Sequence, residues 1–191
     1  MTVIGVVGRL QVQQSRLKPG PPTTRVYDPA PLREVEALEV GPRGCRGLVD
    51  GEWLLDVHHA DHPDSRNVQL VNGLSLLPRS HYTRMAGRYG DHLAVGVAGE
   101  SVLLDTDADL TVDDLAGELV LETADGAVEL GDAMVAAPCV EFSRFALGIE
   151  PGPVGDDVKE ALVVLGDGTR GFYVTPRTTA VVRVGDRLVR R

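Results

Sequence analysis

The chain has 191 residues, of which 43% are hydrophobic and 25% are charged, and its formal net charge at pH 7 is −9. This length and composition are ordinary for one globular domain. The negative charge counts against a general nucleic-acid binder and against a protein that adheres to anionic membranes, because both surfaces repel an acidic protein. No stretch approaches the ~20 apolar residues of a membrane-spanning helix. Since the first residues also lack a basic leader with a long apolar run, we expect a cytoplasmic protein whose two cysteines are reduced.

Strand patterns dominate the first third of the chain. Residues 2–12 are rich in β-branched side chains, and residues 33–40 alternate with a period of two, so both predict strands. Between them, residues 18–31 contain five prolines, which cannot donate hydrogen bonds to a neighbouring strand and therefore predict a loop. Two further strands are predicted at 52–57 and 67–71, on either side of a polar segment that is rich in histidine.

Helix signals are fewer. Residues 78–90 begin with a proline suited to a first turn and end at glycine, which predicts a helix. Residues 111–120 start with threonine followed by acidic residues, which predicts one or two turns. Residues 155–168 show the same features and end at glycine, and strands are predicted after them at 170–176 and 178–184. The whole pattern favours a mainly β fold with peripheral helices, an α+β arrangement built on a β-barrel.

One sequence pattern occurs twice. Residues 128–135 read VELGDAMV and residues 182–189 read VRVGDRLV. Each predicts a strand, a tight Gly-Asp turn and a second strand, with the glycine supplying a positive φ. Short turn motifs of this kind recur by chance, so two similar hairpins are favoured over an internal duplication.

Cys139 follows Pro138 at the start of a predicted helix that ends at Gly148. At a helix N-terminus the unpaired N–H groups favour a thiolate, which is the reactive form of cysteine. The cation of Arg144 on the same helix favours the thiolate as well, whereas the carboxylate of Glu141 opposes it. The alternative is a cysteine that only fills space in the core, as free cysteines often do. Spacing alone favours this alternative.

Residues 56–67 form a second candidate site, with three histidines, three aspartates, an arginine and an asparagine. Imidazole and carboxylate groups are metal ligands, but the HExxH spacing is absent, so the signal for a metal is weak. Arg66 and Asn67 suit an anionic group, with His58 and His62 lining the same pocket. The alternative is a polar loop whose side chains bond only to their neighbours.

Four segments, taken in order, resemble the MOSC domain, a family named after the C-terminal domain of molybdenum cofactor sulfurases. They are GCRGLVDGEWLLDVHH, YGDHLAVGVAGESVLL, VELGDAMVAAPCVEF and GTRGFYVTPRTTAVVRVGDRLV. The likeness is clearest over residues 33–191, and its most specific element is the Pro-Cys pair together with the two Gly-Asp turns. It implies a single domain over residues 1–191 with a MOSC-type β-barrel, in a divergent stand-alone member of bacterial type.

The resemblance also implies a role for Cys139. In the family, the thiol of the Pro-Cys pair faces a cofactor pocket and is proposed to carry persulfide sulfur or to ligate the molybdenum of a pterin cofactor. This favours Cys139 as nucleophile, sulfur carrier or molybdenum ligand, and it leaves Cys45 without a role. The cofactor-binding residues that we expect beside it are His58, His62, Arg66, Asn67 and Arg144.

The expected partners follow from the same resemblance. They are the molybdenum cofactor or a sulfur-donor protein and, for a reduction, an external electron donor, whereas no nucleic-acid or membrane partner is expected. The segment LLDVHH departs from the family's usual Gly-Asp-Arg-His, and the family's N-terminal pterin-gripping arm is not recognisable. Two alternatives therefore stay open: a binding module that has kept the barrel without the chemistry, and a metal-dependent hydrolase that uses the histidine-rich loop.

Overall fold

The computed structural model describes residues 1–65, 67 and 69–191. Its strands are β1 (Thr2–Gln13), β2 (Leu32–Glu34), β3 (Ala37–Gly41), β4 (Gly44–Val49), β5 (Glu52–Leu55), β6 (Leu74–Pro78), β7 (Val102–Asp105), β8 (Leu119–Thr123), β9 (Gly126–Leu130), β10 (Met134–Val135), β11 (Phe172–Val174), β12 (Ala180–Val182) and β13 (Arg187–Arg190). The helices are α1 (Arg79–Tyr89), α2 (Val140–Leu147) and α3 (Asp156–Leu165), with a 3-10 turn η1 (Asp113–Leu115). Within the described ranges, no helix is both long enough and apolar enough to cross a membrane.

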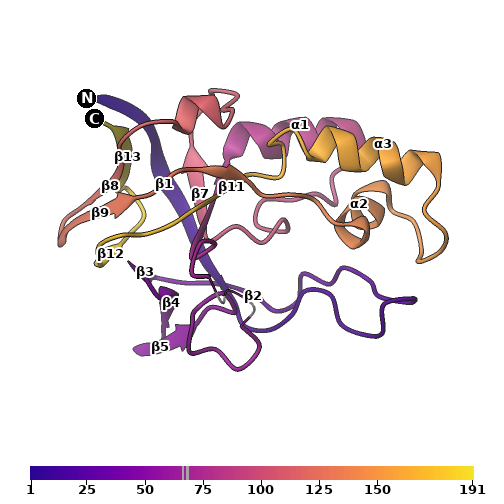
Figure 1. Ribbon diagram of the computed structural model, residues 1–191, viewed down its shortest axis with the longest axis horizontal. Coiled ribbons are helices and arrows are strands. Elements are labelled where there is room, and N and C mark those ends of the chain that lie inside the picture. Colours follow the sequence, from indigo (N-terminus) through magenta and orange to yellow (C-terminus); the bar gives the residue numbers. More distant parts are fainter. Residues whose placement is uncertain (66, 68) are drawn as a thin grey trace.

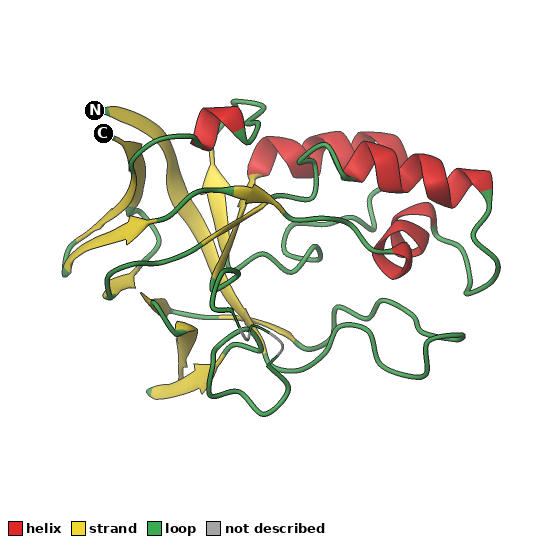
Figure 2. Ribbon diagram, viewed as in Figure 1, coloured by secondary structure: helices red, strands yellow, loops and turns green. Residues whose placement is uncertain are grey.

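The strands form two sheets that curl around a common interior (Figure 2). The larger sheet runs in the order β10-β11-β6-β7-β1-β13-β8-β9, and β2 pairs with β1. Its neighbours are antiparallel except for β6 and β7. The smaller sheet has the order β12-β3-β4-β5. The predicted class, a mainly β fold with peripheral helices, is confirmed, and the larger sheet is a curled half-barrel.

The core has two apolar clusters. One lies between the sheets and includes Val7, Leu10, Leu38, Val40, Leu76, Leu104, Leu121, Val128, Phe172 and Leu188. The other lies where the helices cover the sheet and includes Leu77, Tyr82, Met85, Leu103, Phe142, Ala146, Ala161 and Leu165. Burying each large apolar side chain contributes about 1.5–3 kcal/mol. The second cluster matters for function, because α2 places Cys139 at its edge.

The three predicted longer helices are confirmed, and they gather at one side of the sheets (Figure 1). Helix α1 starts directly after Pro78, whose fixed φ of −66° suits the start of a helix. Helix α2 has Cys139 as its N-cap and ends at Gly148, which adopts a left-handed φ of 66° that glycine reaches without strain. The turn predicted within 111–120 is the short η1, after which the chain enters β8.

The strand predicted at 33–40 is wrong in one respect, since it is two strands, β2 and β3. The backbone N–H of Val35 donates to Leu10 in the larger sheet, while that of Glu36 donates to Leu48 in the smaller one. The chain therefore passes from one sheet to the other at this point. Val35 and Ala37 are buried on either side of exposed Glu36, so the alternation shows no break at the change of sheet.

The strand predicted at 67–71 is also wrong over its described residues, 67 and 69–71, which belong to a turn segment. The strand of this region is β6, which starts at Leu74. The amide oxygen of Asn67 accepts a hydrogen bond from the backbone N–H of Asn72. This local side-chain bond replaces a strand ladder, as asparagine commonly does in turns.

The two Gly-Asp segments do not form hairpins. Strand β9 pairs with β8 and β10 pairs with β11, while β12 joins the smaller sheet and β13 the larger one. Each Gly-Asp turn thus carries the chain to a different partner strand. The predicted positive φ is present at Gly185, at 96°, but not at Gly131.

Candidate functional site

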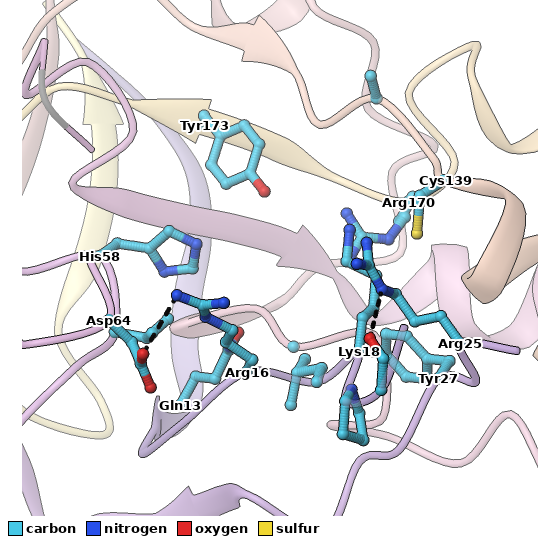
Figure 3. Close-up of a pocket in the computed structure, with 16 residues that line it drawn as sticks. Gln13, Arg16, Lys18, Arg25, Tyr27, His58, Asp64, Cys139, Arg170 and Tyr173 are labelled. Carbon is cyan, nitrogen blue, oxygen red and sulfur yellow. Dashed lines mark hydrogen bonds and ion pairs between the residues drawn. The ribbon is translucent and has the colours of Figure 1, made fainter. Parts of the chain in front are cut away.

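A cavity of about 300 Å³ lies beside Cys139 (Figure 3). Its walls come from segments far apart in the sequence: the loop between β1 and β2, the loop after β5, the residues before α2 and the start of β11. The side chains with polar groups in these walls are Gln13, Arg16, Lys18, Arg25, Tyr27, His58, Asp64, Cys139, Arg170 and Tyr173. Cations thus concentrate at one cavity of a chain whose net charge is −9.

The cations of the wall differ in how they are paired. Arg16 forms an ion pair with Asp64 at 3.2 Å, and Arg25 lies 3.9 Å from a carboxylate oxygen of Glu141. Lys18 and Arg170 form no ion pair with any residue that the structure describes. Because two of the four cations have no ion-pair partner among the described residues, the cavity favours a negatively charged ligand.

Cys139 is partly buried in the cavity wall, and the two cysteines are free thiols in different environments. The Sγ of Cys139 accepts a hydrogen bond from the backbone N–H of Phe142 at 3.4 Å, which is the N-cap bond of α2. Cys45 is fully buried in the core between the sheets, 3.9 Å from the hydroxyl of Ser101, and burial raises the pKa of its thiol. The absence of a role for Cys45 stays a prediction, and its environment is that of an inert thiol.

Alkylation of the folded protein at pH 7 is expected to modify Cys139 and to leave Cys45 unmodified. The thiolate is the nucleophile, and only Cys139 is both accessible from a cavity and placed at a helix N-terminus. Peptide mapping after a short iodoacetamide pulse measures the outcome. Preferential labelling of Cys45, or a disulfide between the two, would contradict this assignment.

Arg170 is the most constrained cation of the cavity. Its Nη2 donates to the carbonyl oxygen of Ala98 at 3.1 Å, and its guanidinium carbon lies 4.9 Å from the centre of the Phe142 ring. The buried Nε donates to no residue that the structure describes. Burial by itself lowers the pKa of Arg170, but Tyr173 and Tyr27 outweigh burial and the pKa is raised. Arg170 therefore carries a permanent charge and a spare donor.

The loop between β1 and β2 is held over the cavity by Tyr27. The Tyr27 hydroxyl donates to the carbonyl oxygen of Val97 at 2.6 Å, next to the carbonyl that Arg170 uses. Its ring packs at 5.0 Å from Phe142 and 5.2 Å from Phe145, measured between ring centres. These contacts fix the course of a proline-rich segment that has no regular pattern of its own.

His58 lies on the side of the cavity opposite Cys139 (Figure 3). Its Nδ1 is 2.8 Å from a carboxylate oxygen of Asp56, and the other oxygen of Asp56 accepts from the backbone N–H of Gln13 at 2.7 Å. Asp56 is only 2% exposed. A buried carboxylate thus fixes the ring of His58, an arrangement that leaves Nε2 for a ligand.

The other predicted binding residues that the structure describes lie outside this wall. His62 bonds to the backbone of Asp64 and Gln14, and Asn67 donates to the carbonyl oxygen of His58. Arg144 donates to the carbonyl oxygen of Gly152 and lines a neighbouring cavity of about 260 Å³. Arg66 lies outside the described residues. Within the described part of the chain, no three His, Cys, Asp or Glu side chains are placed to hold a metal ion.

Of the residues predicted for the site, Cys139 and His58 line this cavity, whereas most of its cations were not predicted. Arg16, Lys18 and Arg25 lie in or beside the proline-rich loop, and Arg170 lies in the segment GTRGFYV. The feature of the sequence that could have predicted these cations is the group of basic residues in or beside the proline-rich loop of an otherwise acidic chain. No periodicity links these positions, because only the folded chain brings them together.

Comparisons with known proteins show similarity of fold alone. No protein-family model matches the chain, and no curated protein matches its sequence. The YuaD protein of Bacillus subtilis is similar with a TM-score of 0.59 at 14% identity, over 98% of this chain and 94% of that one. YiiM from Geobacillus stearothermophilus has a TM-score of 0.55 at 19% identity, over 96% of this chain and 73% of that one. YiiM from Escherichia coli, a MOSC-domain protein, has a TM-score of 0.51 at 14% identity, over 83% of this chain and 65% of that one. This chain therefore has a fold of the MOSC type.

Proposed function

We propose that this chain is a cytoplasmic member of the MOSC family that handles sulfur or a molybdenum–pterin cofactor through Cys139. One observation carries the proposal: the Cys139 thiol lies in the wall of a cavity that also gathers Arg16, Lys18, Arg25 and Arg170. A thiolate and several cations are the groups that a sulfur-bearing or phosphate-bearing ligand requires. The MOSC-type fold supports the same proposal at the level of architecture.

The residues of the cavity fit a molybdenum–pterin cofactor. A thiolate is a soft metal ligand, and one guanidinium group can donate two parallel hydrogen bonds to a phosphate. The buried Nε of Arg170 donates to none of the described residues, and a phosphate oxygen would satisfy it. Cys139 would hold the metal, while Lys18, Arg25 and Arg170 would hold the phosphate. When bound, the cofactor supplies the redox chemistry, and electrons come from a separate donor protein.

Sulfur transfer uses the same residues. The Cys139 thiolate attacks the terminal sulfur of a persulfide on a donor protein, a new S–S bond forms, and the donor's own sulfur leaves as a thiolate. Cys139 is left as a persulfide, so atoms and electrons balance without an outside oxidant. Arg170 and Lys18 stabilise the negative charge on the attacking and the transferred sulfur.

A non-catalytic anion-binding module is the second candidate, and the same group of cations favours it. The two candidates differ in what they require of Cys139. An anion site keeps its ligand when the thiol is replaced by a hydroxyl, whereas sulfur carriage and molybdenum ligation do not.

Cys139→Ser is expected to abolish bound sulfane sulfur and bound molybdenum while the protein stays folded. Serine is nearly isosteric, and it is a preferred N-cap residue, so the bond to the Phe142 N–H is kept. Thiocyanate release by cyanide measures the sulfur, elemental analysis measures molybdenum, and a thermal melt measures stability.

The matched control is Cys45→Ala, which changes a buried thiol that does not line the cavity and should keep normal loading per folded molecule. A Cys139→Ser protein that retains its sulfur or molybdenum would refute the chemistry and leave the binding module as the function.

A further inference from the structure

Glu100 is a buried carboxyl that is next in sequence to Gly99, a residue of the cavity wall. Its side chain is 4% exposed. One carboxylate oxygen accepts a hydrogen bond from the Tyr82 hydroxyl at 2.7 Å, and the other, Oε1, accepts none from the residues that the structure describes. A carboxylate with one donor is poorly compensated for its loss of water.

The groups that act on Glu100 come from α1, β1 and the segment before β11, besides its own backbone N–H. Burial raises the pKa of Glu100 from 4.5 to about 7, against the hydrogen bond from Tyr82 on α1 and the charges of Arg9 on β1 and Arg170 before β11, which lower it. Tyr27, from the loop over the cavity, is affected in turn: burial raises its pKa, the charge of Arg170 lowers it, and the charge of Glu100 raises it. Arg170 is therefore shared, because it lines the cavity and also interacts with Glu100.

We propose that the protonation state of Glu100 controls how tightly the Cys139 cavity binds an anion. Binding of the anion is then accompanied by the uptake of one proton by Glu100. This inference rests on the proposed function in taking the cavity as an anion site. When Glu100 is ionised, its charge offsets that of Arg170 and repels the ligand. When it is neutral, the whole charge of Arg170 acts on the ligand. By linkage, a bound anion favours the protonated form of Glu100 to the same degree.

Sulfate is a suitable probe, because its charge stays constant between pH 6 and pH 8. A free-state pKa of about 7 makes Glu100 largely neutral at pH 6 and largely ionised at pH 8, so sulfate should bind about tenfold more weakly at pH 8. Calorimetric titration in two buffers of different ionisation enthalpy counts the protons. At pH 7 we expect an uptake of about half a proton per sulfate.

Glu100→Gln keeps an acceptor for the Tyr82 hydroxyl and removes the titration. This variant should bind sulfate at pH 8 as tightly as the wild type does at pH 6, without proton uptake. If a histidine of the wall caused the pH dependence instead, the dependence would survive in Glu100→Gln. Tyr82→Phe offers a second approach, since it removes the donor that favours the ionised carboxyl and should move the change in affinity to higher pH.

The outcomes separate this inference from the function on which it rests. Sulfate binding that is unchanged between pH 6 and pH 8, or a pH dependence that survives in both Glu100→Gln and Tyr82→Phe unaltered, overturns the role of Glu100 and leaves the anion site intact. Failure of the wild-type protein to bind sulfate even at pH 6 overturns the anion site itself.

Discussion

Phe142→Ala should lower the free energy of unfolding by about 3–5 kcal/mol, the range seen when a fully buried phenylalanine is truncated. The Phe142 side chain is 0% exposed, and its ring packs edge-on against Tyr27 at 5.0 Å between ring centres. The guanidinium of Arg170 lies over the same ring at 4.9 Å. Truncation leaves a void in the helix-facing core and also removes the surface that positions two residues of the cavity. Urea denaturation measures the loss.

The matched control for this change is Phe145→Ala on the same helix. Phe145 is only partly buried, so its truncation opens a smaller void and should cost distinctly less. A loss below about 1 kcal/mol for Phe142→Ala, or equal losses for the two variants, would show that this ring does not support the core as described.

Arg170→Met should weaken sulfate binding at pH 6 by roughly 10- to 150-fold, because a hydrogen bond to a charged group contributes about 1.5–3 kcal/mol. Methionine keeps apolar contact with the Phe142 ring and removes both the permanent charge and the unpaired Nε. Titration calorimetry gives the affinity, and a thermal melt shows whether the bond to Ala98 matters for stability.

Two further variants sharpen that experiment. Arg177→Met removes the same charge from an exposed position outside the cavity and should leave sulfate binding within about twofold, since exposed charges are well screened. Arg170→Lys keeps the charge without the planar fork and should fall between Arg170→Met and the wild type. Equal binding by Arg170→Met and Arg177→Met would show that Arg170 is not part of an anion site.

The parts of the fold that could be predicted from sequence are those set by local rules. The β-branched run of β1, the proline before α1 and the glycine after α2 each act through a neighbouring dihedral or a fixed period, and each element was found. The place of Cys139 at a helix start follows from the same rules.

What could not be predicted depends on contacts between distant segments. Val35 and Glu36 bond to different sheets, a change that leaves the alternation of side chains untouched. Tyr27 is fixed by a carbonyl group 70 residues away in sequence, so nothing in the proline-rich loop itself shows that its cations reach Cys139. The Gly-Asp turns are alike in sequence, but the partners of their strands are decided by the whole sheet.

The residues that line the cavity come from distant parts of the chain, so ligand binding there depends on the folding of the whole domain. The wall residues extend in sequence from Gln13 to Tyr173. They come from the loops that follow β1 and β5, from the residues before α2 and from the start of β11. A fragment must run at least from residue 13 to residue 173 to contain the full set, so the site requires most of the fold. A bound anion consequently acts as a global folding ligand: it adds RT ln(1 + [L]/Kd) to the stability of the chain, about 2.7 kcal/mol at a hundredfold excess over Kd.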